Sequence, residues 1–388
     1  MKKILIVNSF YYPHVISGAE IFTQMLAESL QNQLEVVILT TGTSKSKLLQ
    51  EEIGAIQIYR LPCLNIYPTA AKNKSVVKKL IWHLINLYHP WQKRLIKKLL
   101  EEIQPDLIHT QNLSGIGTYL WNVGNQLQIP IIHTLHDNTL FQPTKNQFVN
   151  KLAFWVNKKR SKNVTAIVGV SQFILNKHLN KKMFAGAVTE VIYNAIHSKS
   201  YASRIRKDQE PLSIGFFGQL EENKGILTLL KALELIDSEM IASLVICGAG
   251  NLESKIKEAA KKDQRIVFKG KMSLEEVYQS MAQIDLTVVP SEVEESFGRI
   301  VIESYAQGTP VIATNIGALP EIIPQHQFLF ESNNPQSLKS AIEHFYHIPT
   351  EEVFELKQSS MRYARKFQEN NPQFLKLYSR LTKLTINE

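Results

Sequence analysis

The sequence contains almost no cysteine. Cys63 and Cys247 are the only two in 388 residues, too few for a disulfide framework or for a metal site made of four cysteines. We interpret both as small, buried apolar residues. Such a composition is typical of a protein from a reducing compartment, so we expect a cytoplasmic location.

Several catalytic motifs are also absent. The chain has no G-x-x-x-x-G-K-[ST] phosphate-binding loop, no H-E-x-x-H zinc motif and no G-x-S-x-G nucleophile turn. These absences disfavour the enzyme classes that depend on such motifs. We expect no metal site and no cofactor.

The chain lacks a hydrophobic run that would suit a signal peptide or a membrane span. The apolar run in MKKILIVNS ends at Asn8, so we interpret it as a first strand. Residues 107–136 carry no charge, but they are rich in Gln, Asn, His and Gly and do not resemble a membrane-spanning helix.

Acidic residues are scarce in the first half. Residues 1–200 contain 23 Lys and Arg against 10 Asp and Glu, whereas residues 201–388 contain 21 against 25. The net charge is therefore +13 in the first half and −4 in the second. The first half needs an electrostatic partner that the second does not.

What the chain does contain is an alternation of apolar strands and amphipathic helices. Continuous apolar runs indicate strands that are covered on both faces of a parallel sheet. Strands are expected at 4–9, 34–40, 55–60, 106–110, 130–135, 165–170, 188–193, 212–218, 242–248, 265–270, 284–290 and 309–314. The polar segment 197–211 is interpreted as a linker, and the chain beyond Pro335 as helical.

This pattern predicts an α/β protein of two doubly wound, Rossmann-like domains that face each other across a cleft. We expect an N-terminal domain at 1–200, a C-terminal domain at 201–366, and a C-terminal helix at 367–388 that packs back on the N-terminal domain.

The most informative stretch is 284–317, IDLTVVPSEVEESFGRIVIESYAQGTPVIATNIG. A strand ends at Pro290, an acidic loop follows, and a helix opens at Phe297 and Gly298. A glycine at a helix N-terminus allows close approach of an anion such as a diphosphate. Glu295 before the helix and Glu303 inside it suit hydroxyl groups of a ribose and a sugar. We interpret the stretch as a nucleotide-sugar site.

Six ordered blocks carry a resemblance to a known family. They are FYYPHVISGAE (10–20), PIIHTLHD (130–137), VIYNAIH (191–197), FFGQLEENKG (216–225), VICGAGN (245–251) and the long block at 289–323. The chain resembles family 4 retaining glycosyltransferases of the GT-B fold over essentially its full length. The lack of any Asp-x-Asp agrees, because it disfavours the metal-dependent, single-domain transferase fold.

The resemblance implies specific donor contacts. It assigns the donor sugar to Glu295 and the nucleotide ribose to Glu303, and it places Phe297, Gly298 and Arg299 at the diphosphate. It also implies front-face retaining transfer, in which the departing phosphate oxygen helps to deprotonate the acceptor hydroxyl.

Lys224 is a further candidate, because a cation just ahead of a helix can reach a phosphate. The family usually has Arg where this chain has Gln219. A neutral amide can still donate hydrogen bonds, but it brings no charge to the diphosphate. We considered that Arg299 compensates for this loss.

Glycines after strands supply the remaining donor candidates. Gly18 lies between the first strand and a helix, where the family has two glycines and this chain has Ser17 followed by Gly18. Gly248 and Gly250 also follow a strand, and the resemblance places them close to the nucleotide. Each glycine alone is equally compatible with a simple turn.

His136 is the candidate of the first half. A histidine at the carboxyl end of a strand can donate to a sugar hydroxyl or stabilise a polarised transition state. We interpret His109 and His133, which lie inside strands, as structural. The candidate catalytic residues are therefore His136, Glu295 and Lys224.

The basic stretch 74–102 interleaves Lys and Arg with Trp82, Tyr88 and Trp91, and Pro90 divides it into two helices. Basic amphipathic helices with aromatic residues suit an anionic membrane surface on the inner face of the cytoplasmic membrane. The alternative is a packed helix pair with a solvated lysine face. We expect no nucleic-acid partner.

These observations predict a metal-independent retaining glycosyltransferase that takes a UDP- or GDP-linked sugar. Its expected acceptor is a glycan or a polyprenyl-linked molecule in cell-surface polysaccharide or glycolipid biosynthesis. The alternatives are a sugar-nucleotide epimerase of the same architecture and a non-catalytic homologue that binds glycan or membrane.

Overall fold

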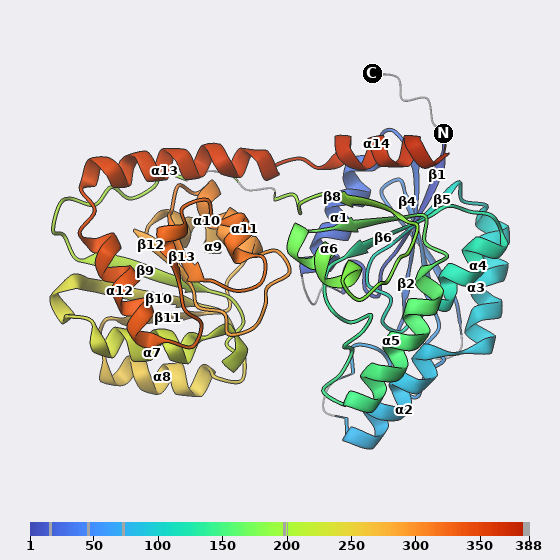
Figure 1. Ribbon diagram of the computed structural model, residues 1–388, viewed down its shortest axis with the longest axis horizontal. Helices are drawn as coiled ribbons and strands as arrows, with labels where there is room; N and C mark the ends of the chain where they lie inside the picture. The colour runs from blue at the N-terminus through green and yellow to red at the C-terminus, as the bar shows by residue number, and fades with distance from the viewer. Residues whose placement is uncertain (15–17, 45–46, 72–73, 197–198, 200, 383–388) are drawn as a thin grey trace. The chain divides into compact units, whose positions relative to one another are not determined.

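The computed structural model describes residues 1–14, 18–44, 47–71, 74–196, 199 and 201–382. They form two compact units, each a parallel or largely parallel sheet with helices packed on it (Figure 1). The N-terminal unit comprises Met1–Tyr193 together with Asn370–Glu388, and the C-terminal unit comprises Asn194–Glu369. Two parallel α/β units confirm the predicted fold class.

The N-terminal unit is built on an eight-stranded sheet with the order β3-β4-β2-β1-β5-β6-β7-β8. β1 lies at its centre, parallel to both β2 and β5. The strands are β1 (Lys3–Val7), β2 (Glu35–Thr41), β3 (Leu49–Ile53), β4 (Ile56–Leu61), β5 (Leu107–Thr110), β6 (Ile131–Leu135), β7 (Ala166–Gly169) and β8 (Val188–Val191).

Helices α1 and α14 share one face of this sheet. Phe22 and Leu26 of α1 and Phe374 and Tyr378 of α14 belong to one buried apolar cluster with sheet residues such as Ile6. The helices are α1 (Gly18–Leu30), α2 (Val76–Leu87), α3 (Pro90–Ile103), α4 (Tyr119–Gln126), α5 (Gln147–Ser161), α6 (Gln172–Leu179) and α14 (Asn371–Thr382).

One strand of this sheet was not predicted. β3 pairs antiparallel with β4 at the edge of the sheet, and all its residues except Glu51 are exposed. Its sequence LQEEI lacks the apolar run that marks a covered strand, because an edge strand with solvent beside it needs no such run. The cysteines differ too: Cys247 is buried as expected, whereas Cys63 is half-buried.

The C-terminal unit has a six-stranded, fully parallel sheet in the order β11-β10-β9-β12-β13-β14. The strands are β9 (Leu212–Phe217), β10 (Ile241–Cys247), β11 (Ile266–Gly270), β12 (Leu286–Val289), β13 (Val311–Thr314) and β14 (Leu329–Phe330). The helices are α7 (Ile226–Leu235), α8 (Glu253–Lys262), α9 (Leu274–Ala282), α10 (Arg299–Ala306), α11 (Leu319–Ile322), α12 (Pro335–Tyr346) and α13 (Thr350–Ala364), with short 3-10 turns that include η1 (Glu222–Lys224).

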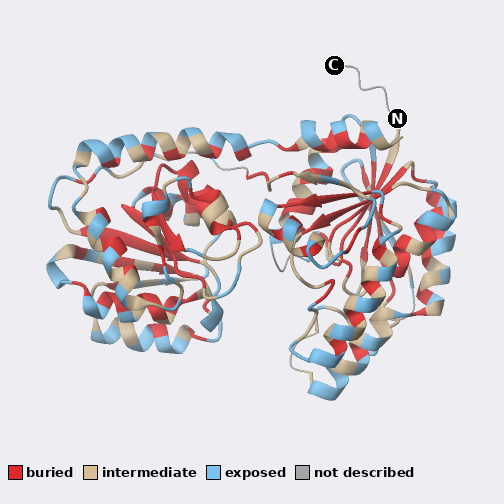
Figure 2. Cartoon of the chain, in the orientation of Figure 1, coloured by how far each residue is buried: buried red, intermediate tan, exposed pale blue. Residues whose placement is uncertain are grey.

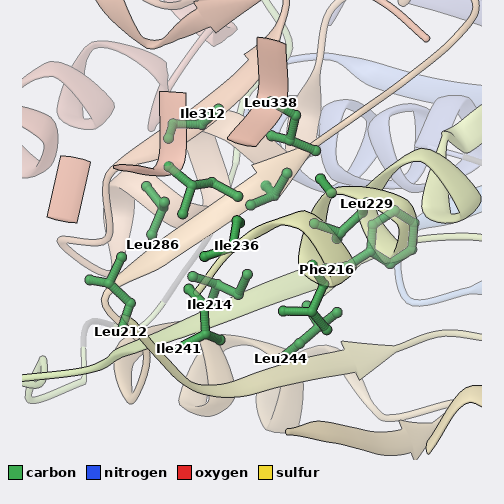
Figure 3. Close-up of a cluster of buried hydrophobic side chains, with 14 of the residues drawn as sticks. Leu212, Ile214, Phe216, Leu229, Ile236, Ile241, Leu244, Leu286, Ile312 and Leu338 are labelled. Carbon is green, nitrogen blue, oxygen red and sulfur yellow. The ribbon is translucent and has the colours of Figure 1, made fainter. Parts of the chain in front are cut away.

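The main core of the C-terminal unit lies between its sheet and helices α7, α8 and α12. Alternate residues of β9, such as Ile214 and Phe216, face Leu229 of α7 and Leu338 of α12 (Figure 3). Phe217 points to the other face, where it packs with Tyr278 and Met281 of α9. Successive side chains of β9 thus pack on opposite faces of the sheet. Because both faces are covered, this strand is apolar throughout.

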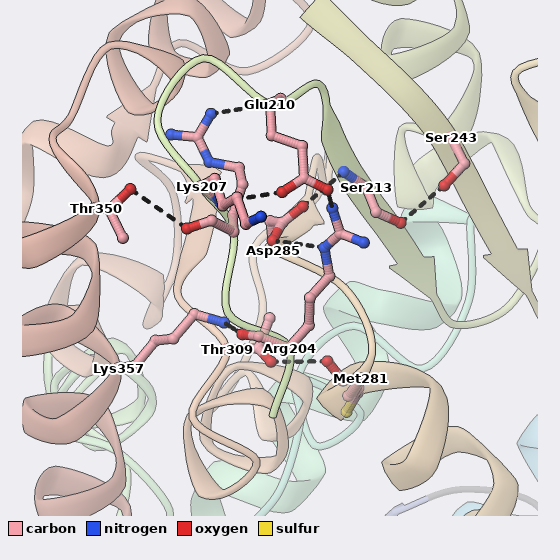
Figure 4. A network of polar contacts seen from close by, with 11 residues as sticks. Arg204, Lys207, Glu210, Ser213, Ser243, Met281, Asp285, Thr309, Thr350 and Lys357 are labelled. Atoms are coloured by element: carbon pink, nitrogen blue, oxygen red, sulfur yellow. Dashed lines mark hydrogen bonds and ion pairs between the residues drawn. The ribbon is translucent and has the colours of Figure 1, made fainter. Parts of the chain in front are cut away.

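The segment interpreted as a linker is anchored to the C-terminal unit. The Arg204 side chain pairs with Asp285, which is 1% exposed and also accepts from the Ser213 N–H (Figure 4). Lys357 of α13 donates to the Arg204 carbonyl at 2.6 Å. The segment from Arg204 onwards therefore belongs to the C-terminal unit.

The basic stretch forms α2 and α3, and Pro90 opens α3 as expected. Trp82 does not project into solvent. It is 5% exposed, its Nε1 donates to the Tyr67 carbonyl at 3.0 Å, and its ring stacks on Tyr67. Tyr88 and Trp91 are exposed by contrast, at 63% and 69%.

Candidate active site

Apart from Gly18, the donor candidates lie in the loops that follow β9, β10 and β12 of the C-terminal unit or in helix α10. In a parallel sheet the carboxyl ends of neighbouring strands lie at one edge, and open α/β sheets bind their ligands there. Gly218 follows β9, Gly248 follows β10, and the acidic loop with Glu295 follows β12. The fold thus brings together three segments that are far apart in the sequence.

Lys224 and Glu295 form an ion pair. Lys224 Nζ lies 2.6 Å from Glu295 Oε1, which also accepts from Ser291 Oγ at 2.8 Å. Glu295 Oε2 takes part in no hydrogen bond with the described residues. Both side chains remain about a quarter exposed. The pair holds a cation and a free carboxylate oxygen side by side at the surface of the loop.

Two glycines, Gly225 and Gly317, allow the close backbone contacts that position the Lys224–Glu295 pair. Gly225 follows Lys224 with φ +71°, and a Cβ there would lie 1.7 Å from the Pro290 carbonyl oxygen. Gly317 also packs closely on the Glu295 backbone, where a Cβ would lie 2.5 Å from the Glu295 nitrogen. Only residues without a side chain allow these approaches. Sequence reasoning missed the roles of Ser291 and Gly317, although both lie in the blocks it singled out.

Glu303 is much less accessible than Glu295. Its side chain is 4% exposed, and its Oε1 accepts from Arg299 Nε at 2.6 Å. Tyr278 Oη donates weakly to the same oxygen at 3.4 Å. Burial and then the Glu303 charge raise the pKa of Tyr278, so this phenol stays protonated.

Arg299 pairs with Glu303 in this structure, and its assignment to the diphosphate stays a prediction. Its guanidinium is held by the carboxylate one helical turn away, an i, i+4 pair on α10. Glu303 raises the pKa of Arg299 against the effect of burial, so the guanidinium stays charged. Nε of Arg299 is bound to Glu303, whereas its buried Nη1 has no hydrogen-bond partner among the described residues.

The N-terminus of α10 offers backbone groups rather than side chains. Gly298 caps the helix with φ +90°, and no side chain accepts from its first N–H groups. Phe297 is 4% exposed and packs on Phe367 at 6.0 Å. A phosphate could therefore meet Phe297 only through its backbone.

Gly248 and Gly250 bring two loops into contact. A Cβ on Gly248 would lie 1.8 Å from the Gly218 carbonyl oxygen, and one on Gly250 would lie 2.4 Å from the Leu220 oxygen. The loop after β10 thus supports the loop after β9. Gln219, between these contacts, is exposed and bonded to none of the described residues. Its amide is free to donate to a ligand.

In the N-terminal unit, His136 ends β6 and belongs to a chain of hydrogen bonds. Its Nε2 lies 2.6 Å from Gln111 Oε1, and Gln111 Nε2 lies 3.0 Å from His109 Nε2. His109 Nδ1 lies 2.6 Å from Tyr378 Oη on α14. Sequence reasoning missed Gln111 and Tyr378, because only the fold brings Gln111 next to His136 and Tyr378 next to His109.

This chain determines which nitrogen of His136 carries the proton. An amide oxygen can only accept, so Nε2–H donates to Gln111 and Nδ1 keeps its lone pair. Burial lowers the pKa of His136 to about 4, so the ring is neutral at pH 7. The sequence had suggested that His136 donates to a sugar or stabilises charge. In the structure Nε2–H donates to Gln111, and Nδ1 can accept a hydrogen bond from a hydroxyl.

Gly18 lies at the same end of the N-terminal sheet as His136. Phe22, one turn into α1, packs edge-on against the His136 ring at 5.2 Å. Gly18 is exposed at the start of α1, whereas Ser17 lies outside the described residues. Among the parts of the chain that the structure describes, no group of three His, Cys, Asp or Glu could hold a metal ion.

Comparisons with known proteins agree with this architecture. Residues 16–199 match the model "Glycosyltransferase Family 4", and residues 197–367 match "Glycosyl transferases group 1". A protein of the Klebsiella pneumoniae cps region is 27% identical over 356 residues, covering 88% of this chain and 93% of the relative.

Two solved structures are similar in fold. Sucrose-phosphate synthase from Thermosynechococcus elongatus matches with a TM-score of 0.76 and 20% identity, over 99% of this chain and all of that one. Anabaena HepE, in complex with UDP, matches with a TM-score of 0.68 and 16% identity, over 98% of this chain and all of that one.

Proposed function

Because this chain belongs to glycosyltransferase family 4, whose members are retaining, metal-independent enzymes that use nucleotide sugars, we propose that its C-terminal unit holds the donor and its N-terminal unit the acceptor. The observation that carries this proposal is the Lys224–Glu295 pair at 2.6 Å, beside the uncapped N-terminus of α10. A cation and helix N–H groups suit a diphosphate, and a free carboxylate oxygen suits a sugar hydroxyl.

Donor binding would open the Lys224–Glu295 pair. Since both side chains are partly exposed, the pair contributes on the order of 1 kcal/mol at most and is easily exchanged for ligand contacts. Lys224 would then turn to the diphosphate with Gln219, while Glu295 would accept from the donor sugar. Ser291 would keep Glu295 in place during this exchange.

Glu303 would hold the nucleotide ribose through Oε2, since Oε1 is occupied by Arg299. In this proposal Arg299 orients the carboxylate and Tyr278 closes its far side. The phosphate contacts near α10 would come from the backbone N–H groups of Gly298 and Arg299. Gly248 and Gly250 would act by supporting the loop that carries Gln219.

We propose the transfer step that is expected of a retaining enzyme. The bond between the anomeric carbon and the phosphate oxygen breaks, and the acceptor oxygen bonds to the same face of that carbon. The acceptor's proton passes to the departing diphosphate, whose charge Lys224 and the helix N–H groups neutralise. His136 Nδ1 would accept a hydrogen bond from a sugar hydroxyl and so orient it.

For the acceptor, we propose a glycan or polyprenyl-linked molecule of cell-surface polysaccharide synthesis. The support is the relative in the Klebsiella cps region, which matches along 93% of its own length. For the donor we propose a UDP- or GDP-linked sugar. The UDP complex of HepE shows that a protein of this fold accommodates a uridine nucleotide.

We also propose that the enzyme works at the inner face of the cytoplasmic membrane. Val77, Ile81, Leu84 and Tyr88 project from one face of α2 and are exposed. The adjoining helices α2 and α5 both expose part of their surface (Figure 2). Residues 53–100 and 138–189 contain no Asp or Glu, so these two helices carry only positive charge. Such a face suits an anionic bilayer surface.

The aromatic anchors of this surface differ from those expected. Trp82 is buried against Tyr67 and cannot insert into a bilayer, whereas Trp91 can. Trp155 of α5 is 64% exposed and was not considered from the sequence. No helix within the described residues is long and apolar enough to cross a membrane.

A donor screen tests the proposed function directly. The purified chain is incubated with UDP- and GDP-linked hexoses, with and without a polyprenyl-linked glycan acceptor, and free nucleoside diphosphate is measured. We expect release with one donor, dependent on acceptor, and loss of release in Glu295→Ala. Nucleotide-sugar epimerisation without acceptor would support the epimerase instead. Absence of nucleotide binding would support the non-catalytic alternative.

A further inference from the structure

The N-terminal unit contains a cavity that the donor chemistry does not use. It comprises about 560 Å³ of unfilled space, part of it open to solvent, of which about 60 Å³ can be occupied by the centres of water molecules. It lies among α2, α5 and the loops after β5 and β6. A smaller cavity beside His136 shares three of its wall residues, Leu113, Thr139 and Leu140. The two cavities thus lie on either side of one wall.

The lining of the larger cavity has a definite chemical character. It combines apolar side chains such as Leu113 and Leu140 with uncharged polar ones, and none of its lining residues carries a permanent charge. Burial lowers the pKa of His83, so this histidine is neutral at pH 7. A phosphate or carboxylate would find no cation among the lining residues, and burying it would be costly. Arg160, behind this lining, already donates to the Leu87 carbonyl and the Thr118 hydroxyl. A purely apolar chain would leave the polar groups unpaired.

Three polar groups of the lining have unused hydrogen-bonding capacity. Asn86 Oδ1 accepts from the Gly115 N–H at 2.8 Å, which fixes the amide and leaves its NH2 group without a partner in the described chain. The Ser114 hydroxyl and the ring nitrogens of His83 also have no hydrogen-bond partner in the described chain. All three residues are half-buried, so the cavity reaches the surface.

The wall that carries these groups is held in place. Gly115 has φ +80°, a conformation that favours glycine, and a Cβ there would lie 2.2 Å from Thr69 Oγ1. Its N–H is bound by Asn86 and its carbonyl by Gln92 Nε2 at 2.8 Å. On the other side, Thr139 is fixed by two hydrogen bonds to Asp137, the neighbour of His136.

We propose that this cavity binds an uncharged sugar unit of the acceptor, next to the unit that is glycosylated beside His136. The inference rests on the proposed function and adds the class of acceptor: a glycan with a neutral sugar at this position. A sugar ring presents C–H faces to Leu113 and Leu140 and hydroxyls to Asn86, Ser114 and His83.

Saturation-transfer NMR on the full chain tests this proposal. The probes are the methyl glycosides of glucose, galactose and mannose, with glucose 6-phosphate as the charged comparator. Asn86→Asp keeps the oxygen that accepts from Gly115 but removes the NH2 donor, and we expect at least tenfold weaker binding of the preferred glycoside. Ser114→Ala is the second variant, with a smaller loss expected.

Asn122→Asp is the matched control, because Asn122 Oδ1 likewise accepts a hydrogen bond, from Asn163, outside the cavity. It should leave glycoside binding unchanged. Binding of no neutral glycoside, stronger binding of glucose 6-phosphate, or equal binding by wild type and both cavity variants would overturn the proposal. Nucleoside diphosphate binding, measured on the same samples, reports separately on the donor site.

Discussion

At the scale of single residues, the two acidic candidates differ in accessibility and in partner. Glu295 pairs with a partly exposed lysine that a ligand can displace, whereas Glu303 pairs with an arginine on its own helix. One carboxylate is therefore exchangeable and the other is pre-oriented. This difference leads to distinct expectations for their substitution.

Glu303→Gln should weaken nucleoside diphosphate binding by about 1–3 kcal/mol, because a charged hydrogen bond to the ribose is lost. Calorimetry with UDP and GDP measures this. Glu292→Gln is the control. Glu292 lies in the acidic loop before α10, accepts a hydrogen bond from Thr228 and has no proposed ligand contact. Unchanged affinity in Glu303→Gln would disprove the assignment to the ribose.

Glu295→Ala should leave the affinity for free UDP or GDP nearly intact while turnover collapses, because Glu295 is proposed to touch only the sugar. The same calorimetry and a transfer assay on one preparation give both values. If nucleotide affinity falls as much as in Glu303→Gln, the proposed division between sugar and ribose is wrong.

Gln111→Leu should lower kcat about tenfold, since one hydrogen bond worth roughly 1.4 kcal/mol no longer orients His136. The donor KM should not change, because Gln111 lies in the N-terminal unit. Gln111→Glu keeps an oxygen acceptor for Nε2–H and should retain more activity than Gln111→Leu. Equal kcat in wild type and Gln111→Leu would mean that the hydrogen bond is not needed for transfer.

At the scale of elements, α2 presents an apolar and basic face to solvent although its one tryptophan is buried. Each lysine near an anionic leaflet contributes about 1 kcal/mol, and salt screens the attraction. Lys78→Gln with Lys79→Gln should therefore reduce co-sedimentation with anionic vesicles, and wild-type binding should fall with added salt.

The control for α2 changes two exposed lysines elsewhere. Lys261→Gln with Lys262→Gln removes the same charge from the end of α8 in the C-terminal unit. This variant should bind vesicles like the wild type. If the wild type itself ignores anionic vesicles at low salt, α2 and α3 are an ordinary packed pair and the acceptor is soluble.

At the scale of the whole molecule, buried histidines link stability to pH. Burial lowers the pKa of His109 to about 3 and that of His178 to about 4, below the ordinary 6.5. At pH values between 6.5 and these lowered pKa values, the unfolded chain binds protons that the folded chain does not. Stability is therefore full above pH 6.5 and falls as the pH drops towards 4.

The expected loss for His178 is about 3 kcal/mol, since each pKa unit corresponds to about 1.4 kcal/mol. Chemical unfolding between pH 7.5 and 4.5 measures it, and His178→Gln should show a smaller decrease. His326→Gln, in the short 3-10 turn η3 (His326–Phe328) of the C-terminal unit, is the control and should follow the wild type. A stability independent of pH over this range would contradict the prediction.

The sequence by itself determined the two parallel α/β units, because an apolar run for each covered strand and a proline at the start of α3 are local properties. It also determined which loops carry the charged candidates. It did not predict β3, whose edge position removes the need for apolar residues.

Only the tertiary structure decided what those candidates contact. Tyr378 meets His109 across 269 positions of sequence, and Lys224 meets Glu295 across 71. The local sequence likewise could not reveal that Trp82 is buried. Periodicity assigns a residue to a face of its own element, whereas its partners depend on which elements pack against that face.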